Sequence, residues 1–495
     1  MPRVPLLSGT SLVVANADGA AVLRPPPPGR ATEVEAATRE ALRFPLAGEP
    51  LETLARGRGL ATVVIEPPAL PIPGLNADLR QRAIGTVVDA LEGLGIPTEQ
   101  QTLLVACGLM RRTAQRSLPG LVTPELARRF HGRVVVHDAE DPDLVPLDDG
   151  PPPLRVAREL VEADVVVVVT SAESVLDGGP SALLAACGAG AQRRATTYSL
   201  LETAGSAGWR LATRLEQALA RRVPLLGVSL VLNHPHLTGL LRGYPYEPEA
   251  ADRIVRSPLR HLYGLTPPFV RRRVLSSLSA ERTVAAVLAG PPSVAHAEAL
   301  LRAIELRGTS LPEPLDALVV GSPGTTPFLP REGPNPLVAA HLGLSRALGL
   351  WRDAFPVADG GVAILVSGFR RRFAHPTQQP YRVFFRAAPL ARDPELLAAA
   401  EAAATDARSV EEYRAGRTVH PLLPFRDWEA CRPALDRLSS VYVAGARDAS
   451  AVRQLGFVPI GSIGAAIQMA RGEAGPGARI GFLLAPPYFP LKVGG

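Results

Sequence analysis

The hydrophobic and polar positions along the chain predict strands that alternate with helices over most of its length. The most apolar run, residues 165–169 (VVVVV), contains no polar position, which is typical of a strand covered on both faces of a parallel sheet. Asp177, Gly178 and Gly179 then interrupt the pattern, and a helix of small residues is predicted from Ser181. A strand, a glycine turn and a helix start place backbone N–H groups at the carboxyl edge of a sheet, where α/β folds hold their ligands. This segment is therefore the first candidate site.

Similar strand patterns recur on both sides of this run, separated by stretches with helical periodicity. The others in the first half are residues 61–66, 102–108, 133–141 and 223–233. A second series starts near residue 283, with predicted strands at residues 316–324, 360–368, 440–446 and 478–486. Strands and helices alternating at this spacing predict an α/β fold with doubly wound parallel sheets.

The length of 495 residues is too great for one ordinary core, so two domains are expected. The pattern becomes irregular around residues 267–280, which puts the boundary near residue 280. We therefore predict an N-terminal α/β domain over residues 1–280 and a C-terminal α/β domain over residues 281–465. Residues 466–495 are expected to form a C-terminal segment that could return to the N-terminal domain.

Composition excludes several classes of protein. An apolar fraction of 46% excludes a disordered chain, and every apolar run is broken before it reaches the ~18 residues that a membrane span needs. The N-terminal stretch lacks the features of a signal peptide. Cys107, Cys187 and Cys431 are far apart and have no CxxC spacing, so they are expected to be reduced core residues of a cytoplasmic protein.

The charged residues limit both the predicted partners and the possible chemistry. The net charge of +6 is carried by arginines scattered over many helices, and aromatic residues make up only 5%, so no nucleic-acid partner is predicted. Of the 53 basic residues, Lys492 is the only lysine. No lysine amine is therefore available elsewhere in the chain for a Schiff base, a covalent cofactor link or a general base.

Several segments follow one another in an order that covers nearly the whole chain. LLVACGLMRRT ends one predicted strand, VVVHDAED ends the next, and ADVVVVVTSAES leads to GGPSALLAACGAG. The second half adds GGVAILVSG and VRQLGFVPIGSIGAAIQMA. In this order the segments resemble the nickel-pincer lactate racemase family.

The resemblance implies two α/β domains around an interdomain cleft, and an isomerase (racemase or epimerase) activity on 2-hydroxy acids. In that family a nickel ion held by a sulfur-bearing pyridinium nucleotide accepts and returns hydride at the α-carbon of the substrate. The nucleotide is attached through a lysine, one histidine binds nickel, and two further histidines act as acid and base.

This sequence departs from the family at each of those positions. The attachment lysine corresponds to Ser181, and the catalytic histidine of the Gly-x-His-Arg-x-Thr turn corresponds to Met110, which has no titratable proton. No Gln-Lys pair lies near His341, where the family has one. The other expected functional residues are replaced by Ser171, Glu173, Ser174, Tyr198, Ser199, Ala69 and Leu70. We therefore predict that no nickel-pincer cofactor and no metal are bound.

The candidate ligand-binding residues that remain lie at predicted strand ends. Arg111 and Arg112 could bind a carboxylate or phosphate bidentately, or could be solvated arginines at a helix start. His137 and Asp138 match the family's His-Asp pair, although a role in the turn is preferred. Glu66 could bind a ligand hydroxyl or be an ordinary turn carboxylate.

The glycine turn and two histidine positions complete the set of candidates. Asp177 with Gly178 and Gly179 could bind an anion, but a negative Asp favours helix capping. His341 lies near the family's Gln-Lys position. His234 and His236 have metal-pair spacing without a third ligand, so we expect a loop pair.

Two hypotheses follow. The first is a degenerate lactate racemase-like protein, a pseudoenzyme acting as a binding or regulatory partner, as a homo-oligomer or with an intact racemase subunit. The second is an enzyme that acts on a small 2-hydroxy acid, carboxylate or phosphorylated substrate in the same cleft, by racemisation or by different chemistry.

Overall fold

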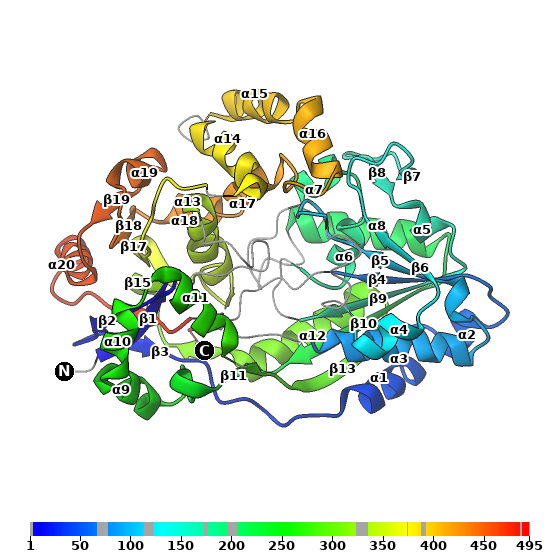
Figure 1. The fold of residues 1–495 in the computed structure, drawn as a ribbon, viewed down its shortest axis with the longest axis horizontal. Helices are drawn as coiled ribbons and strands as arrows, with labels where there is room; N and C mark the ends of the chain where they lie inside the picture. The colour runs from blue at the N-terminus through cyan, green and yellow to red at the C-terminus, as the bar shows by residue number, and fades with distance from the viewer. Residues whose placement is uncertain are drawn as a thin grey trace.

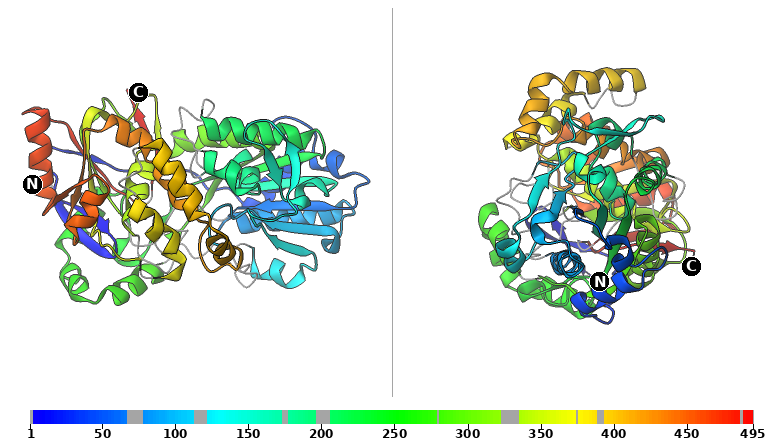
Figure 2. Two further views of the ribbon diagram at one scale, coloured as in Figure 1. Left: turned by 90° about the horizontal axis from the view of Figure 1, so that it is seen from above. Right: turned by 90° about the vertical axis from the view of Figure 1, so that its right-hand side faces the viewer.

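The computed structural model describes residues 3–66, 78–112, 122–172, 177–195, 206–278, 280–322, 335–373, 375–387, 393–485 and 488–494. These residues form two α/β lobes that lie side by side (Figures 1 and 2). Each lobe is built on one six-stranded sheet. We name them the first sheet and the second sheet.

The first sheet has the order β13-β10-β9-β4-β5-β6. Five strands are parallel, and the edge strand β13 is antiparallel to β10. Their bounds are β4 (Ala61–Ile65), β5 (Gln101–Val105), β6 (Arg133–Val136), β9 (Val165–Ser171), β10 (Leu225–Leu232) and β13 (Val284–Gly290).

Helices cover both faces of the first sheet, as the valine run predicts. Val165, Val167 and Val169 point into the core under α1 and α3, whereas Val166 and Val168 point into the core under α6 and α8. The helices of this lobe are α1 (Val34–Arg43), α2 (Leu51–Ala55), α3 (Arg80–Gly93), α4 (Pro124–Arg129), α5 (Arg158–Val161), α6 (Pro180–Leu184), α7 (Ala189–Arg194), α8 (Ala207–Ala220) and α12 (Pro292–Arg307). A hairpin of β7 (Val145–Asp148) and β8 (Leu154–Val156) adds to the second of these faces.

The second sheet has the order β19-β18-β17-β15-β20-β3, with all neighbours parallel. Its strands are β3 (Ala21–Leu23), β15 (Leu315–Gly321), β17 (Val357–Val366), β18 (Ser440–Ala444), β19 (Val458–Ile460) and β20 (Ile480–Leu483). Two sheets with parallel strands and helices on both faces confirm the predicted fold class.

One face of the second sheet packs against the hairpin of β1 (Arg3–Ser8) and β2 (Ser11–Asn16) and against several helices. These are α9 (Pro248–Arg256), α11 (Pro268–Ser277) and α20 (Ile463–Ala474), whereas α10 (Leu259–Leu265) contacts β2 and α9 and has no buried residue. The other side of the lobe carries α13 (Pro336–Ala340), the π-helical segment η4 (His341–Ala347), α14 (Gln379–Ala387), α15 (Pro394–Ala404), α16 (Ala407–Arg414), α17 (Leu423–Glu429), α18 (Arg432–Arg437) and α19 (Ala449–Gln454). Short strands form two small sheets, β14 (Thr309–Leu311) with β21 (Leu491–Val493) and β16 (Trp351–Arg352), and β11 (His236–Leu237) with β12 (Ala280–Glu281).

The lobe to which each strand belongs does not follow the expected domain ranges 1–280, 281–465 and 466–495. β13 and α12 follow residue 280 but belong to the first lobe, while β1–β3 and α9–α11 precede it and pack on the second lobe. The segment 466–495 supplies β20 to the second sheet, and its β21 pairs with β14 and β16. The physical reason is that these assignments depend on strand pairing between distant parts of the chain, which local periodicity does not contain.

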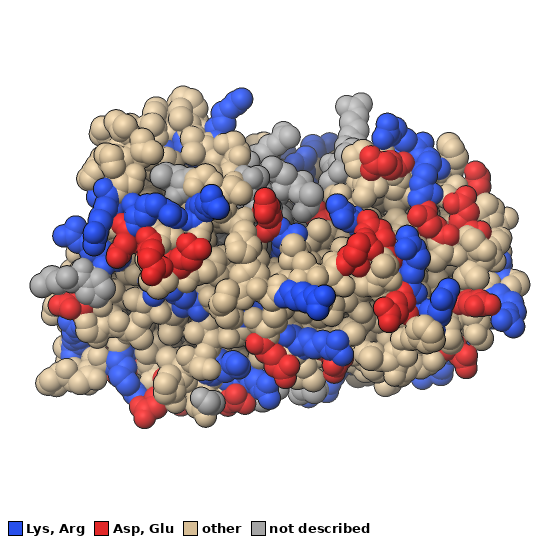
Figure 3. Space-filling view, turned by 90° about the horizontal axis from the view of Figure 1, so that it is seen from below, with Lys and Arg blue, Asp and Glu red and all other residues tan. Residues whose placement is uncertain are grey.

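Two further features of the structure concern membrane spans and the distribution of surface charge. No helix of the described part is long and apolar enough to cross a membrane. Positive and negative side chains are interspersed on the face of the molecule that Figure 3 shows. That mixture agrees with the scattered arginines of the sequence.

Candidate functional site

The glycine turn after β9 uses its backbone N–H groups inside the protein. Gly178 N donates to Glu66 Oε2 at 3.3 Å, and Gly179 N donates to Thr170 Oγ1 at 3.1 Å. Both glycines have positive φ, +99° and +53°. The donors that the sequence places at this edge therefore bind buried side chains of the first lobe. Asp177 does not cap the following helix, because Gly179 holds the N-cap position of α6.

A buried histidine that sequence analysis missed covers this turn. His296 on α12 is 1% exposed, and its Nδ1 lies 3.0 Å from Ser229 Oγ. A Cβ on Gly178 would lie 2.2 Å from the His296 ring, so the ring packs directly on the turn. Burial lowers the pKa of His296 to about 4, which keeps the imidazole neutral at pH 7. A single histidine in an ordinary amphipathic helix gives no signal for this position.

Glu66 is a buried ion-pair partner rather than a solvated turn residue. Its carboxylate lies 3.7 Å from Arg80 Nη1, and Arg80 Nε also donates to Asp78 Oδ2 at 2.8 Å. Arg80 is 2% exposed, so this carboxylate and guanidinium neutralise each other in the interior.

A chain of polar side chains joins the turn to the second lobe. Arg346 Nη1 donates to Asp177 Oδ2, and Arg346 Nε donates to His341 Nε2 at 3.3 Å. His341 Nδ1 then bonds the Asp427 carbonyl at 3.1 Å, and Tyr381 donates its hydroxyl to Asp427 Oδ2 at 2.6 Å. Burial lowers the pKa of His341 despite the nearby Asp427. A neutral His341 can then accept from Arg346 while it donates to the Asp427 carbonyl.

The His-Asp strand end forms a second group of contacts between the lobes. His137 is buried, and its Nε2 lies 2.8 Å from the Cys187 carbonyl. Asp138 lies 3.4 Å from Arg112 Nη1 and accepts from Arg414 Nε of the second lobe at 3.1 Å. Its Oδ1 also accepts from the backbone N–H of residue 140, which is the turn role that the sequence favours.

The loop that carries Met110 is held against the second lobe. Arg111 donates to the Gly416 carbonyl at 2.8 Å, and Tyr413 donates its hydroxyl to the Gly108 carbonyl at 3.1 Å. His420 N donates to the carbonyl of residue 109 at 2.9 Å. Met110 itself is half-buried against the core of the second lobe. The arginines predicted to meet a ligand thus bind the protein's own backbone and carboxylates.

His234 and His236 lie apart from the contacts of the glycine turn and from those of the His-Asp strand end. His234 is buried with Nε2 3.3 Å from the Arg307 carbonyl, and His236 lies in β11 against Tyr246. Within the described ranges, no group of three His, Cys, Asp or Glu side chains could hold a metal ion. Ala69, Leu70, Glu173, Ser174, Tyr198 and Ser199 lie outside the described residues.

The side chains present do not fit a covalently attached pincer nucleotide. Ser181, which the sequence resemblance matches with the attachment lysine, offers a half-buried hydroxyl in the first lobe. Lys492 lies in β21 of the second lobe, paired with Ser310 and Arg352 across the strands. The face of the glycine turn beside Ser181 is covered by the His296 ring. Among the described residues, the lysine amine of this chain therefore lies in the other lobe from Ser181.

The fold and these contacts define a two-lobed α/β protein whose lobes contact each other beyond the carboxyl ends of β5, β6 and β9. Residues 8–177 match the model of the lactate racemase N-terminal domain family. This part of the chain is therefore similar to the lactate racemase N-terminal domain, the family that its ordered landmarks resemble.

A solved structure of a lactate racemase supports the assignment of the fold. The lactate racemase apoprotein from Thermoanaerobacterium thermosaccharolyticum matches with a TM-score of 0.61 and 14% identity, over 99% of each chain. A crystal structure of a protein from Thermotoga maritima matches with a TM-score of 0.47 and 12% identity, over 94% of this chain and 100% of that chain. No curated protein matches the chain.

The buried histidines predict how stability depends on pH. Burial lowers the pKa of His137 to about 4, as it does for His296, whereas an unfolded histidine titrates near ~6.5. Below pH 6.5 the unfolded chain therefore binds protons before the folded chain does. We expect stability to fall between pH 6.5 and 4, by up to roughly 1.4 kcal/mol per pH unit for each histidine.

Urea unfolding at pH 7, 6 and 5 measures this effect. His137→Gln should flatten the fall in the unfolding midpoint, while the same change at the exposed His261 should leave it as in the wild type. Equal pH dependence in the His137→Gln variant and the wild type would contradict the assignment.

Proposed function

We propose that this protein is a degenerate member of the lactate racemase-like superfamily. It lacks nickel-pincer racemase activity and acts as a binding or regulatory protein. The observation that carries the proposal is the hydroxyl of Ser181 at the attachment position, in a chain whose single lysine lies in the other lobe. Met110 at the position of the catalytic histidine supports it. The buried cysteines, all free thiols, support the cytoplasmic location that forms part of the proposal.

The use of the remaining polar groups also supports this proposal over an enzyme of different chemistry. Arg111 binds a carbonyl of the second lobe, and Asp138 is paired with Arg112 and Arg414. His137 is buried and neutral at pH 7. A general acid or base needs an accessible proton and a pKa near the working pH, and burial of His137 provides neither.

An exposed apolar face supports a protein partner. α10 contains no buried residue, and Leu262 and Leu265 are 60% and 84% exposed. Phe269 at the start of α11 is 72% exposed. Leu262 and Leu265 are three residues apart and therefore share one side of α10. Large exposed apolar side chains in such an arrangement are typical of interaction surfaces. The proposal assigns this face to contact with another protein chain, either a second copy or a racemase subunit.

The proposal predicts that the purified full-length protein does not racemise 2-hydroxy acids. Protein produced with nickel and with the enzymes that make the pincer nucleotide should show no covalent mass adduct and no interconversion of D- and L-lactate. Intact-protein mass spectrometry and chiral chromatography measure these two quantities. Nickel-dependent racemisation of any 2-hydroxy acid would refute the proposal, and an intact lactate racemase processed in parallel is the positive control.

A further inference from the structure

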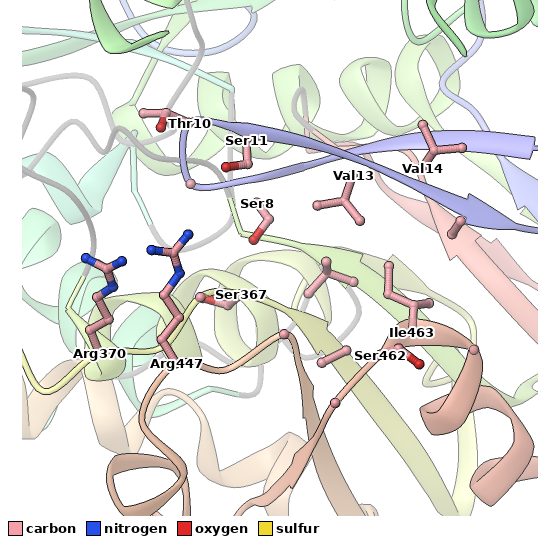
Figure 4. Close-up of a pocket in the computed structure, with 18 of the residues that line it drawn as sticks. Ser8, Thr10, Ser11, Val13, Val14, Ser367, Arg370, Arg447, Ser462 and Ile463 are labelled. Carbon is pink, nitrogen blue, oxygen red and sulfur yellow. The ribbon is translucent and has the colours of Figure 1, made fainter. Parts of the chain in front are cut away.

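A pocket of about 540 Å³ lies at the carboxyl edge of the second sheet. It is open beyond the ends of β17, β18 and β19, and the turn of the β1–β2 hairpin forms its opposite wall (Figure 4). Ligands of open α/β sheets bind outside the carboxyl ends of the strands, and a volume of this size suits a small molecule. None of the candidate residues discussed above lines this pocket.

The pocket has the electrostatic character of an anion site. Its lining includes Arg271, Arg370 and Arg447, and it contains no aspartate or glutamate. Figure 4 shows the guanidinium groups of Arg370 and Arg447 at one end of the pocket, near the hydroxyl of Ser367. Within the described part of the structure, neither guanidinium forms an ion pair, in contrast to Arg112 and Arg346 at the contacts between the lobes.

A buried arginine adds a further cationic group to the lining. Arg271 lines the pocket, is only 9% exposed, and donates from Nη1 to the Gly264 carbonyl at 3.3 Å. Its buried Nε has no hydrogen-bond partner among the described residues. Because buried donors are normally paired, this N–H group is available to an anionic ligand.

The start of α20 adds backbone donors. Ser462 caps this 12-residue helix by accepting from Ala465 N, and its carbonyl accepts from Ala466 N. That leaves the first two N–H groups of the helix, at Ile463 and Gly464, and both residues line the pocket. The N-terminal end of a helix carries partial positive charge and favours phosphate.

The remaining walls suit the organic part of a ligand. Val13 and Ile463 supply apolar surface (Figure 4). A Cβ built on Gly461 would meet no atom within 4 Å, so the space before this turn is open. We propose that the pocket binds an organic phosphate of nucleotide size, with phosphate groups held by Arg370, Arg447 and the α20 N-terminus and a ring against the apolar wall. This site does not depend on whether the racemase activity has been lost.

Isothermal titration calorimetry of the full-length protein with AMP, ADP, adenosine and inorganic phosphate tests the proposal. AMP and ADP should bind with one site per chain, ADP more tightly, and adenosine about 100-fold more weakly than AMP because it has no phosphate. Inorganic phosphate should also bind more weakly than AMP, since it cannot use the apolar wall. No binding of either nucleotide, or phosphate binding as tight as that of AMP, would overturn the proposal.

Substitution of Arg370 and Arg447 tests whether the nucleotide binds in this pocket. The double variant Arg370→Ala/Arg447→Ala should raise the Kd for ADP about 100-fold, since each guanidinium contributes a charge-assisted contact. Arg453→Ala is the matched control, because Arg453 is an exposed arginine on α19 that does not line the pocket, and its Kd should stay within about twofold of the wild type. Circular dichroism shows whether both variants are folded. ADP binding that the double variant leaves unchanged would place the ligand elsewhere and contradict the proposal.

Discussion

Replacing Arg346 by methionine is expected to lower the free energy of unfolding by about 3 kcal/mol, because the change leaves buried polar groups without their partner. Arg346 is 3% exposed, donates to Asp177 of the first lobe and to His341 Nε2, and lies in η4. Methionine keeps most of the volume but no donor. Asp177 is 29% exposed and can regain some hydration, so the loss should lie at the lower end of the range for broken buried pairs.

Urea unfolding followed by circular dichroism measures this loss. Arg352→Met is the matched control, because Arg352 and Asp353 form a surface pair at 3.6 Å with side chains 41% and 50% exposed. Its removal should cost less than about 1 kcal/mol. Hydrogen exchange should also become faster in α6 and η4 of the Arg346→Met variant, which a local effect confined to one lobe does not predict. Equal losses in the two variants would contradict a special role for the Arg346 contacts.

The sequence contains the parts of the fold that depend on local pattern. Five consecutive valines predict a strand covered on both faces, and alternate valines of β9 do enter two different cores. The sequence does not contain the pairing of distant segments. β3 has three residues near the N-terminus and joins the second sheet through β20, close to the other end of the chain. For the same reason, an edge strand such as β13 cannot be assigned to its lobe by periodicity.

In the candidate site, too, contacts between residues that are distant in the sequence could not be predicted. A charged residue at a strand end can be located from the sequence, but its partner cannot. Arg111 and Asp138 lie at such ends, and their partners, Gly416 and Arg414, come from the second lobe. Arg346 did offer a signal, because it is a lone charge in the apolar stretch of residues 336–351, and a charge in such a position is usually buried and paired.

The glycine turn after β9 has a structural role of its own in this chain. In this chain the turn organises buried contacts, since its N–H groups bind Glu66 and Thr170 and its surface packs on His296. Those contacts do not need a cofactor. A substitution in the turn therefore tests stability, whether or not the protein has the racemase activity that the proposed function denies it.

Gly178→Ala is accordingly expected to lower the free energy of unfolding by roughly 3–5 kcal/mol, which combines backbone strain with overpacking. The φ of +99° is one that an alanine rarely adopts, and the new Cβ would lie 2.2 Å from Cε1 of His296. The ring cannot easily move away, because it is 1% exposed and its Nδ1 is bonded to Ser229. Urea unfolding of the purified variant measures the loss.

Two further variants separate the two causes. Gly190→Ala is the control, since Gly190 lies within α7 and a Cβ there meets no atom within 4 Å, so stability should stay the same or rise by up to about 1 kcal/mol. His296→Ala removes the three ring atoms that the Gly178 Cβ would meet. The double variant Gly178→Ala/His296→Ala should therefore lose less stability than the sum of the single variants, and the remaining loss reports the backbone strain. Strict additivity would show that the ring does not confine the turn, and wild-type stability of Gly178→Ala would show that the positive φ is not required.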